Sequence, residues 1–356
     1  MDDLRAKFPV FERLAYFNAG SNGPVPQPAL DAVAGSLRLQ ADEGRGDRAH
    51  FEENARRIDE LRMRIAGLLG CVTAEVALTG STTDGVNAVL LALDLQAGDD
   101  VLTSDEEHPG VLGPLAALRD RRRVRVRRVP VEDLPSEVRP ETKLVACSHV
   151  SWRTGRVVDA PALAATDALV LLDGAQGLGA VPTDVTELGC DFYAASGQKW
   201  LCGPNGLGYL YVPEALAAAL PPPWPNYGVL ADSTSPFDLH LHPDARRFSI
   251  GFPAPHQIEW AHAALDALEE AGIDAVHARA TELAAALAER LAGRVAPRGR
   301  STLVSWDDDD PEAAVERLRG EGFVVRHLPG TPYVRASVGA WNTEEEVVRL
   351  AAAATR

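Results

Sequence analysis

Hydrophobic positions in the middle of the chain fall into short, continuous runs. Residues 100–103, 144–148, 170–173, 192–196 and 206–212 are each rich in apolar residues and are separated by polar or Gly-rich segments. Runs of this length without polar alternation are typical of β-strands buried on both faces. The pattern therefore predicts the buried strands of a mostly parallel sheet covered on both sides.

Longer stretches with helical character accompany these runs. Residues 29–69 read as mostly helical with a break near 44–46, and a turn at residue 80 leads into a helix ending near residue 93. Residues 1–15 are expected to form a short lead-in helix. The alternation of strands and helices predicts an α/β fold, built on a doubly wound, mostly parallel sheet.

The C-terminal third has a different pattern: predicted helices and strands follow one another, but the continuous apolar runs of the central part are absent. The predicted elements are helices at 257–271, 274–291, 311–320 and 343–354 and strands at 302–306, 323–326 and 333–338. Thr343 with Glu346 forms a capping-box pattern at the start of the last helix. We therefore expect a small α+β domain from residues 1–15 and 246–356, beside a large domain at 16–245.

Two segments fit neither pattern. Residues 221–248 begin with PPPWP and form a long irregular stretch, and such loops are usually functional or lie at interfaces. In residues 119–128, RDRRRVRVRR, arginines alternate with Val124 and Val126. This segment is expected to form a strand with a solvated basic face.

Composition and charge exclude several function classes. The chain has 356 residues, 46% of them hydrophobic, and a formal net charge of −16, which opposes non-specific binding to nucleic acid or anionic membranes. The N-terminal residues contain no apolar stretch of a secretory signal, and the longest apolar runs are too short for a membrane span. We expect a cytoplasmic protein that binds neither nucleic acid nor membrane.

The cysteines and the acidic cluster at 307–310 do not indicate a metal site. The four cysteines show no paired spacing for zinc or for a disulfide framework, which favours a reduced cytoplasmic protein. The four aspartates precede the helix predicted at 311–320, where carboxylates complement the helix dipole. We therefore expect no bound metal.

Lys199 is unusual because the chain uses arginine almost everywhere else. Among 35 Lys and Arg residues only Lys7, Lys143 and Lys199 are lysines. Lysine can lose its proton and condense with an aldehyde, whereas arginine cannot. Lys199 follows the run at 192–196, and Asp173 ends the run at 170–173; ligands of open α/β sheets bind outside the carboxyl ends of strands. A surface lysine in a loop is the alternative.

Three sequence pieces around these residues carry a resemblance. They are DGAQ at 173–176, SGQK at 196–199 and GPNGLG at 203–208. Their order and spacing resemble the motifs of fold-type I enzymes that depend on pyridoxal 5′-phosphate (PLP), and more narrowly the class V aminotransferase and cysteine desulfurase superfamily. The resemblance extends from Tyr16 to the final helix. It implies a PLP cofactor, a small amino-acid substrate and a homodimer with active sites at the interface.

The resemblance also implies catalytic roles. Lys199 would bond the cofactor covalently, Asp173 would face the pyridine nitrogen and keep it protonated, and Gln176 would contact the ring hydroxyl. His108, in the EHPG piece at 107–110, would stack on the ring.

A phosphate cradle is expected at the start of the helix near residue 84. Ser81 and Thr82 lie in the turn before it, and helix N-termini bind phosphate; ordinary N-capping by these hydroxyls is the alternative. Ser196 and Gln198 would complete the cradle. Relatives carry a threonine that reaches the neighbouring subunit's phosphate where this chain has Phe252, so only a backbone contact is expected there.

Substrate contacts are implied at three positions. Arg335, in the piece RAS at 335–337, would bind the substrate α-carboxylate, and Arg326 ends the preceding strand. Trp152 stands where desulfurases usually have Asn, and its WRTG context is similar to the cystine C–S lyase branch. A surface charge is the alternative for either arginine alone.

The reaction type depends on a missing cysteine. Desulfurases need a mobile Cys that lies between the two arginine positions, but residues 327–334 contain none and no Cys follows Cys202. The chain is therefore expected to catalyse α,β-elimination from cystine or a cysteine derivative, giving pyruvate, ammonia and a thiol or persulfide. The alternatives are a class V aminotransferase or a desulfurase-like enzyme without the loop Cys. A non-catalytic protein of the same fold is disfavoured by the intact Lys199, Asp173 and Gln176.

Overall fold

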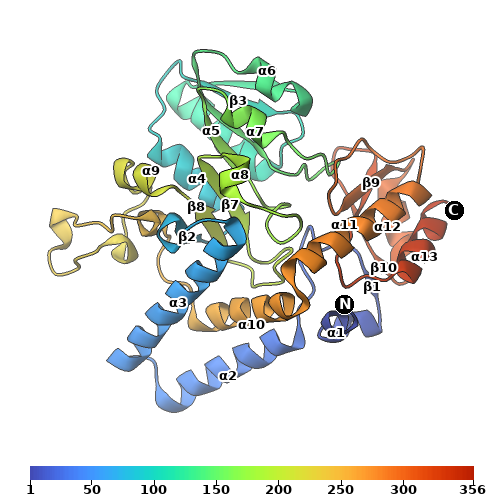
Figure 1. The fold of residues 1–356 in the computed structure, drawn as a ribbon, viewed down its shortest axis with the longest axis horizontal. Helices are drawn as coiled ribbons and strands as arrows, with labels where there is room; N and C mark the ends of the chain where they lie inside the picture. Colours follow the sequence, from blue (N-terminus) through green and yellow to red (C-terminus); the bar gives the residue numbers. More distant parts are fainter.

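A seven-stranded sheet forms the centre of the larger part of the molecule (Figure 1). The computed structural model describes all 356 residues. The sheet order is β2-β8-β7-β6-β5-β3-β4. Its strands are β2 (Val76–Thr79), β3 (Asp100–Ser104), β4 (Arg125–Val129), β5 (Thr142–Ser148), β6 (Leu169–Asp173), β7 (Phe192–Ser196) and β8 (Gly208–Tyr211). Strands β3 to β7 run parallel, whereas β8 is antiparallel to both β7 and β2. The predicted α/β fold with a mostly parallel sheet is confirmed.

Side chains of the central strands alternate between two apolar cores. In β5, Leu144 and Ala146 belong to one core and Val145 and Cys147 to the other. The first core is covered by α4 (Thr82–Ala92), α5 (Pro109–Arg122) and α9 (Glu214–Ala219), and the second by α3 (Arg48–Leu69), α7 (Ala160–Ala164), α8 (Val185–Leu188) and α10 (Pro255–Ala271). Helices on both faces explain why these strands read as continuous apolar runs.

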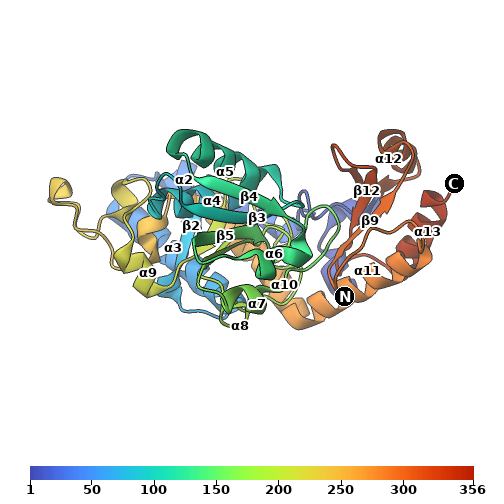
Figure 2. The same ribbon diagram turned by 90° about the horizontal axis from the view of Figure 1, so that it is seen from above.

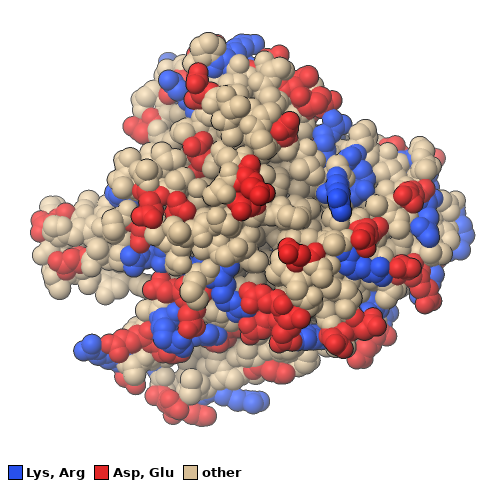
Figure 3. Space-filling view, in the orientation of Figure 1, with Lys and Arg blue, Asp and Glu red and all other residues tan.

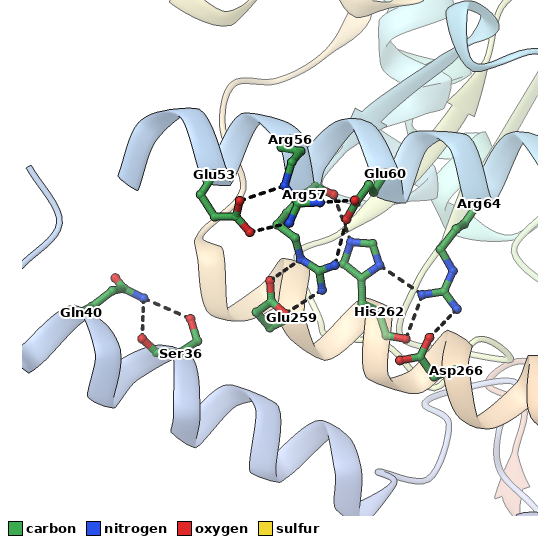
Figure 4. Close-up of polar contacts among 10 residues, drawn as sticks. All are labelled: Ser36, Gln40, Glu53, Arg56, Arg57, Glu60, Arg64, Glu259, His262 and Asp266. Atoms are coloured by element: carbon green, nitrogen blue, oxygen red, sulfur yellow. Dashed lines mark hydrogen bonds and ion pairs between the residues drawn. The ribbon is translucent and has the colours of Figure 1, made fainter. Parts of the chain in front are cut away.

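Helix α10 lies between α3 and α2 (Gln27–Glu43). Figure 4 shows polar contacts that cross from α3 to α10: Arg57 donates to both oxygens of Glu259 at 2.8 and 2.7 Å, and Arg64 pairs with Asp266 at 2.8 Å. The apolar side of α10 contributes Leu265 to the second core of the large sheet. The predicted division between residues 245 and 246 stays a prediction. Helix α10 lies on the C-terminal side of this division but packs into the core of the large sheet.

The second part of the molecule is a small α+β unit at one end (Figure 2). Its antiparallel sheet has the order β11-β12-β9. The elements of this unit are β9 (Leu303–Asp307), β10 (Phe323–Val324), β11 (Arg326–His327), β12 (Tyr333–Ser337), α11 (Ile273–Arg290), α12 (Pro311–Gly320) and α13 (Glu344–Ala354), with β1 (Ala15–Tyr16) paired to β10. Thr343 accepts from the Glu346 N–H at 3.1 Å, and Glu346 accepts from the Thr343 N–H at 3.0 Å, which confirms the predicted capping box.

Two local predictions were wrong. Residues 1–15 do not form one helix, because α1 (Asp2–Ala6) ends early and Pro9 begins a short 3₁₀ turn, η1 (Pro9–Glu12). Within residues 119–128 the first four end helix α5, Arg123 adopts a left-handed φ of 58°, and only β4 is a strand. Its basic face is not wholly solvated either, because Arg127 pairs with the buried Asp100 at 2.9 Å.

Residues 221–248 contain three short 3₁₀ turns, η4 (Tyr227–Val229), η5 (Pro236–Asp238) and η6 (Ala245–Phe248), and one isolated antiparallel bridge between Leu230 and Leu241. The segment projects from the body at the left of Figure 1. Its Phe237 is fully exposed (100%). None of the helices combines the length and the apolarity that a membrane span requires.

Gly208 sets the distance between β8 and the start of α4, so its substitution tests this packing. A Cβ at Gly208 would lie 2.7 Å from Thr79 Oγ1 and 2.8 Å from the Ser81 backbone. Because backbone must move, Gly208→Ala is expected to lower the free energy of unfolding by about 1–3 kcal/mol in denaturant titration. The control is Gly67→Ala in α3, where a Cβ meets nothing within 4 Å and stability should rise by about 0.5–1 kcal/mol. Unchanged stability of Gly208→Ala would contradict this packing.

Candidate active site

One cavity of about 260 Å³ lies where the parallel strands of the large sheet end and faces the small unit. The side chains that the sequence singled out all line it: Ser81, Thr82, His108, Trp152, Asp173, Gln176, Ser196, Gln198, Lys199, Arg326 and Arg335. They come from loops after β2, β3, β5, β6 and β7 and from β11 and β12. The structure thus brings the predicted residues together, while the role of each one stays a prediction.

Asp173 and Lys199 form the charged centre of the cavity. Asp173 is the last residue of β6, is 6% exposed and accepts a hydrogen bond from the Ala175 N–H at 2.9 Å. Burial raises the pKa of Asp173, and the Lys199 ammonium opposes this shift. Burial likewise lowers the pKa of Lys199 to about 8, against the effect of Asp173 and together with that of Arg335 and Arg326. A substantial fraction of the amine is therefore neutral near physiological pH.

The backbone around Lys199 is fixed by a tight crossing with the N-terminal loop. The Gly23 N–H donates to the Gln198 carbonyl at 2.7 Å, and a Cβ at Gly23 would lie only 2.1 Å from the Lys199 carbonyl oxygen. On the other side, the Gly203 N–H donates to the Gly197 carbonyl at 2.9 Å and closes the turn. Lys199 is therefore held on a closed turn at the end of β7.

Gln176 is held from two sides. Its Nε2 donates to the Gly20 carbonyl at 2.8 Å, and its Oε1 accepts from the Trp200 indole N–H at 3.0 Å. A carboxamide nitrogen carries two hydrogens, so one donor remains for a ligand.

The N-terminus of α4 offers hydroxyl and amide groups to the cavity. Ser81 caps the helix by accepting from the Asp84 N–H at 3.1 Å, and the Ser196 hydroxyl accepts from the Thr82 N–H at 3.1 Å. The Oε1 atom of Gln198 is buried without a hydrogen-bond partner. Donors at a helix N-terminus favour an anion such as phosphate, whereas Gln198 Oε1 can only accept a hydrogen bond and would pair with a donor group.

His108 lines the cavity as the N-cap of α5. Its Nδ1 accepts from the Gly110 N–H at 2.9 Å, so the proton of the neutral ring resides on Nε2. Burial, then the positive charges of Lys199 and Arg326, lower the pKa of His108 to about 4. The ring packs edge-to-face against Trp152, with centroids 5.1 Å apart. His108 therefore presents an uncharged ring.

Arg335 and Arg326 face the cavity from the small unit without any carboxylate partner. They are directly paired across β11 and β12, where like charges destabilise a sheet. Arg335 is 1% exposed, and its Nη1 donates to the Trp152 carbonyl at 2.8 Å, while Nε and Nη2 have no partner. Burial, then Arg326, lower the pKa of Arg335 to about 9, so it remains charged at neutral pH. Two guanidinium groups without a carboxylate partner favour an anionic ligand.

Sequence reasoning did not identify five further lining residues. These are Gly20, Ser21, Asn22, Thr83 and Ala175. A Cβ at Gly20 would lie 2.7 Å from Ser337 Oγ and 3.1 Å from Arg335 Nη2, so only glycine leaves this room. The resemblance to the family implies that the loop at residues 16–28 borders the active site, but the sequence does not show which of its residues enter the site, because that depends on contacts with the distant small unit.

The donor set fits PLP. A primary amine with a lowered pKa, a buried carboxylate, an uncharged aromatic ring and a helix N-terminus match the aldehyde, pyridine nitrogen, ring face and phosphate of this cofactor.

Comparison with known proteins gives a consistent result. The family described as aminotransferase class-V matches residues 15–299. Isopenicillin N epimerase of Amycolatopsis lactamdurans is 31% identical over 94% of this chain and 93% of its own. The cysteine desulfurase of Salmonella agona is 29% identical over 100% of this chain and 98% of its own.

Among solved structures, a variant of the cystine C–S lyase C-DES with glycine covalently linked to its PLP cofactor superposes with a TM-score of 0.92. It is 26% identical, over 98% of both chains. A second structure of C-DES, with its reaction product cysteine persulfide, has a TM-score of 0.91.

The lowered pKa of Lys199 gives a pH-dependent prediction. Amine-reactive labelling of the cofactor-free protein, followed by peptide mass mapping, should give Lys199 a midpoint near pH 8, because burial disfavours its ammonium form. Asp173→Asn should lower the midpoint further, since it removes the charge that favours the ammonium. Lys7 and Lys143 serve as references in the same protein. A midpoint at the ordinary 10.5, or an upward shift in Asp173→Asn, would contradict the site electrostatics.

Proposed function

The chain belongs to the class-V aminotransferase family, and from this premise we propose that it is a PLP-dependent enzyme that catalyses α,β-elimination on cystine or a similar cysteine derivative. The products are pyruvate, ammonia and a thiol or persulfide. The observation that carries the proposal is the cavity itself: a lysine of lowered pKa beside a buried carboxylate faces two arginines that have no carboxylate partner.

Cofactor binding is assigned to residues of the large sheet. Lys199 Nζ would bond the aldehyde carbon of PLP, and Asp173, at the end of β6, would face the pyridine nitrogen. The α4 N-terminus with Ser196 would receive the phosphate, and His108 would cover the ring. When bound, PLP supplies an electron sink for the bonds at the substrate α-carbon.

The protein's own contribution is to bind the substrate and to move one proton. The guanidinium of Arg335 has Nε and Nη2 free for two parallel hydrogen bonds to the substrate α-carboxylate. Lys199 Nζ would accept the proton from the substrate α-carbon, and the burial that lowers its pKa favours the neutral amine that a base needs. The β-sulfur would then leave as a thiolate or persulfide anion with the electron pair of the C–S bond, and water would convert the remaining three-carbon unit into pyruvate and ammonia. His108 would stay uncharged throughout.

Cystine offers a second carboxylate, which distinguishes it from cysteine. Arg326 lies opposite Arg335 in register and is less buried, with its Nη1 bound to the Ser21 hydroxyl at 3.1 Å. A ligand with two carboxylates would relieve the repulsion between both guanidinium groups. Trp152 closes the cavity beside His108 and leaves its indole N–H unpaired.

Elimination is favoured over desulfuration because no thiol reaches the cavity. The segment between Arg326 and Arg335 is a short hairpin, closed by the Leu328 N–H donating to the Tyr333 carbonyl at 2.9 Å, and it contains no cysteine. The four cysteines are free, and none lines the cavity. Transamination, which needs no thiol either, is the second candidate.

A homodimer and a cytoplasmic location are part of the proposal. The projecting segment 221–248 exposes Tyr227 and Phe237, and Phe252 is exposed just after it; a second copy would cover these rings. Acidic and basic side chains are interspersed over the face in Figure 3, a distribution that does not suit a nucleic-acid backbone. A monomer in sedimentation at micromolar concentration would contradict the dimer.

Product analysis tests the proposed reaction. Purified protein loaded with PLP is incubated separately with cystine, with cysteine, and with cystine plus an oxoacid, and the products are identified by mass spectrometry. We expect equal amounts of pyruvate and ammonia from cystine, together with cysteine persulfide. Arg335→Leu should raise the KM for cystine at least about tenfold, because it removes a buried charge pair with the substrate.

Two outcomes would overturn the elimination. Stoichiometric alanine from cysteine would identify a desulfurase. Amino transfer to the oxoacid without pyruvate release from cystine would identify an aminotransferase.

A further inference from the structure

Glu107 is a buried carboxyl group that directly precedes the cavity-lining His108, and the proposed chemistry leaves it unused. It is 4% exposed and follows the end of β3. Its Oε1 accepts from the Ser148 N–H at 3.0 Å and from the Ser104 hydroxyl, and its Oε2 accepts from the Ser148 hydroxyl at 2.7 Å. No cation is among the groups that act on it. A buried acid without a counter-charge is costly, so its presence needs a reason.

The hydrogen bonds of Glu107 join two adjacent strand ends. Successive N–H groups of β5 point to opposite neighbours: the His149 N–H donates to β6 at the Asp173 carbonyl, so the Ser148 N–H points toward β3. Strand β3 ends at Ser104 and offers no further backbone partner. The Glu107 side chain takes that place and ties the turn after β3 to the end of β5.

The two aromatic rings of the cavity, those of His108 and Trp152, belong to the segments that this hydrogen-bonded junction joins. His108 is the residue next to Glu107, and Trp152 follows Ser148 by four residues. The neighbouring Glu106 accepts from the hydroxyls of Ser151 and Thr154 on the same loop as Trp152. The two adjacent carboxyl groups therefore connect the turn that carries His108 to the loop that carries Trp152.

We propose that Glu107 is a positioning residue, which fixes His108 and Trp152 relative to each other across the ends of β3 and β5. The use of these two rings in binding and catalysis rests on the proposed function. The fixing itself is a property of the cofactor-free protein.

The role is one of hydrogen-bond geometry and does not need a permanent charge. Burial raises the pKa of Glu107 to about 7, against the hydrogen bonds from Ser104 and Ser148. Glutamine has the shape of the protonated acid: its oxygen can accept from Ser104 and from the Ser148 N–H, and its amide can donate to the Ser148 hydroxyl after that hydroxyl rotates. Positioning therefore predicts rescue by glutamine, whereas a need for negative charge predicts none.

The test compares Glu107→Ala, Glu107→Gln and the control Asp105→Asn, whose exposed side chain lies in the same turn. In the cofactor-free protein, hydrogen–deuterium exchange of residues 105–110 and 148–154 should be at least about tenfold faster in Glu107→Ala and within about threefold of wild type in the other two. The loaded Ala variant should lose about 10- to 100-fold in kcat with cystine, because small misplacements of site groups have effects of this size.

Each outcome decides the proposal. Unchanged exchange in Glu107→Ala would overturn it, and so would exchange in Glu107→Gln as fast as in Glu107→Ala. If Glu107→Ala does not fold, Ser148→Ala takes its place, since it removes the hydroxyl donor to Oε2; faster exchange at 105–110 supports the proposal, and wild-type exchange overturns it. Absence of cystine turnover in the wild type would refute the proposed function and leave the exchange result standing.

Discussion

Charge buried without matching counter-charge is the constraint on which this site depends. Lys199 and Asp173 at the sheet, and Arg335 and Arg326 across the gap, leave an excess of positive charge around one cavity. Such an arrangement is costly in an empty protein and favourable around an anionic ligand. The same burial that makes it costly lowers the pKa of Lys199 toward neutrality. Binding of anions and activation of the amine therefore have one physical cause.

The architecture supplies that constraint in two parts. The parallel strands β3, β5, β6 and β7 end at a common edge, so the loops that follow them meet there. The small unit then closes the edge with the hairpin of β11 and β12, and Arg335 reaches across to the Trp152 carbonyl. Glu107 contributes to the same edge of the sheet. Its side chain accepts a hydrogen bond from the Ser148 N–H at the end of β5, which would otherwise be unpaired.

Sequence predicted those parts that depend on local pattern. Strands β5, β6 and β7 are buried on both faces, so their continuous apolar runs could be recognised in the sequence. Strand β2 (Val76–Thr79) was not predicted, because it is short and its partner β8 is distant in the chain. The prediction of one strand at residues 119–128 was wrong because arginines in the last turn of α5 and in β4 together form one continuous basic pattern. The cavity residues from the N-terminal loop, the pairing of the two arginines and the contacts of Glu107 all depend on tertiary register, which no local pattern encodes.

Borohydride reduction of the PLP-loaded protein, followed by peptide mapping, tests most directly whether Lys199 is the residue on which this site depends. The chain has only three lysines, so the result is unambiguous. The predicted result is a pyridoxyl label on Lys199 alone, lost in Lys199→Ala while labelling elsewhere does not increase. A label on Lys7 or Lys143 with Lys199 unmodified would contradict the assignment of the active site.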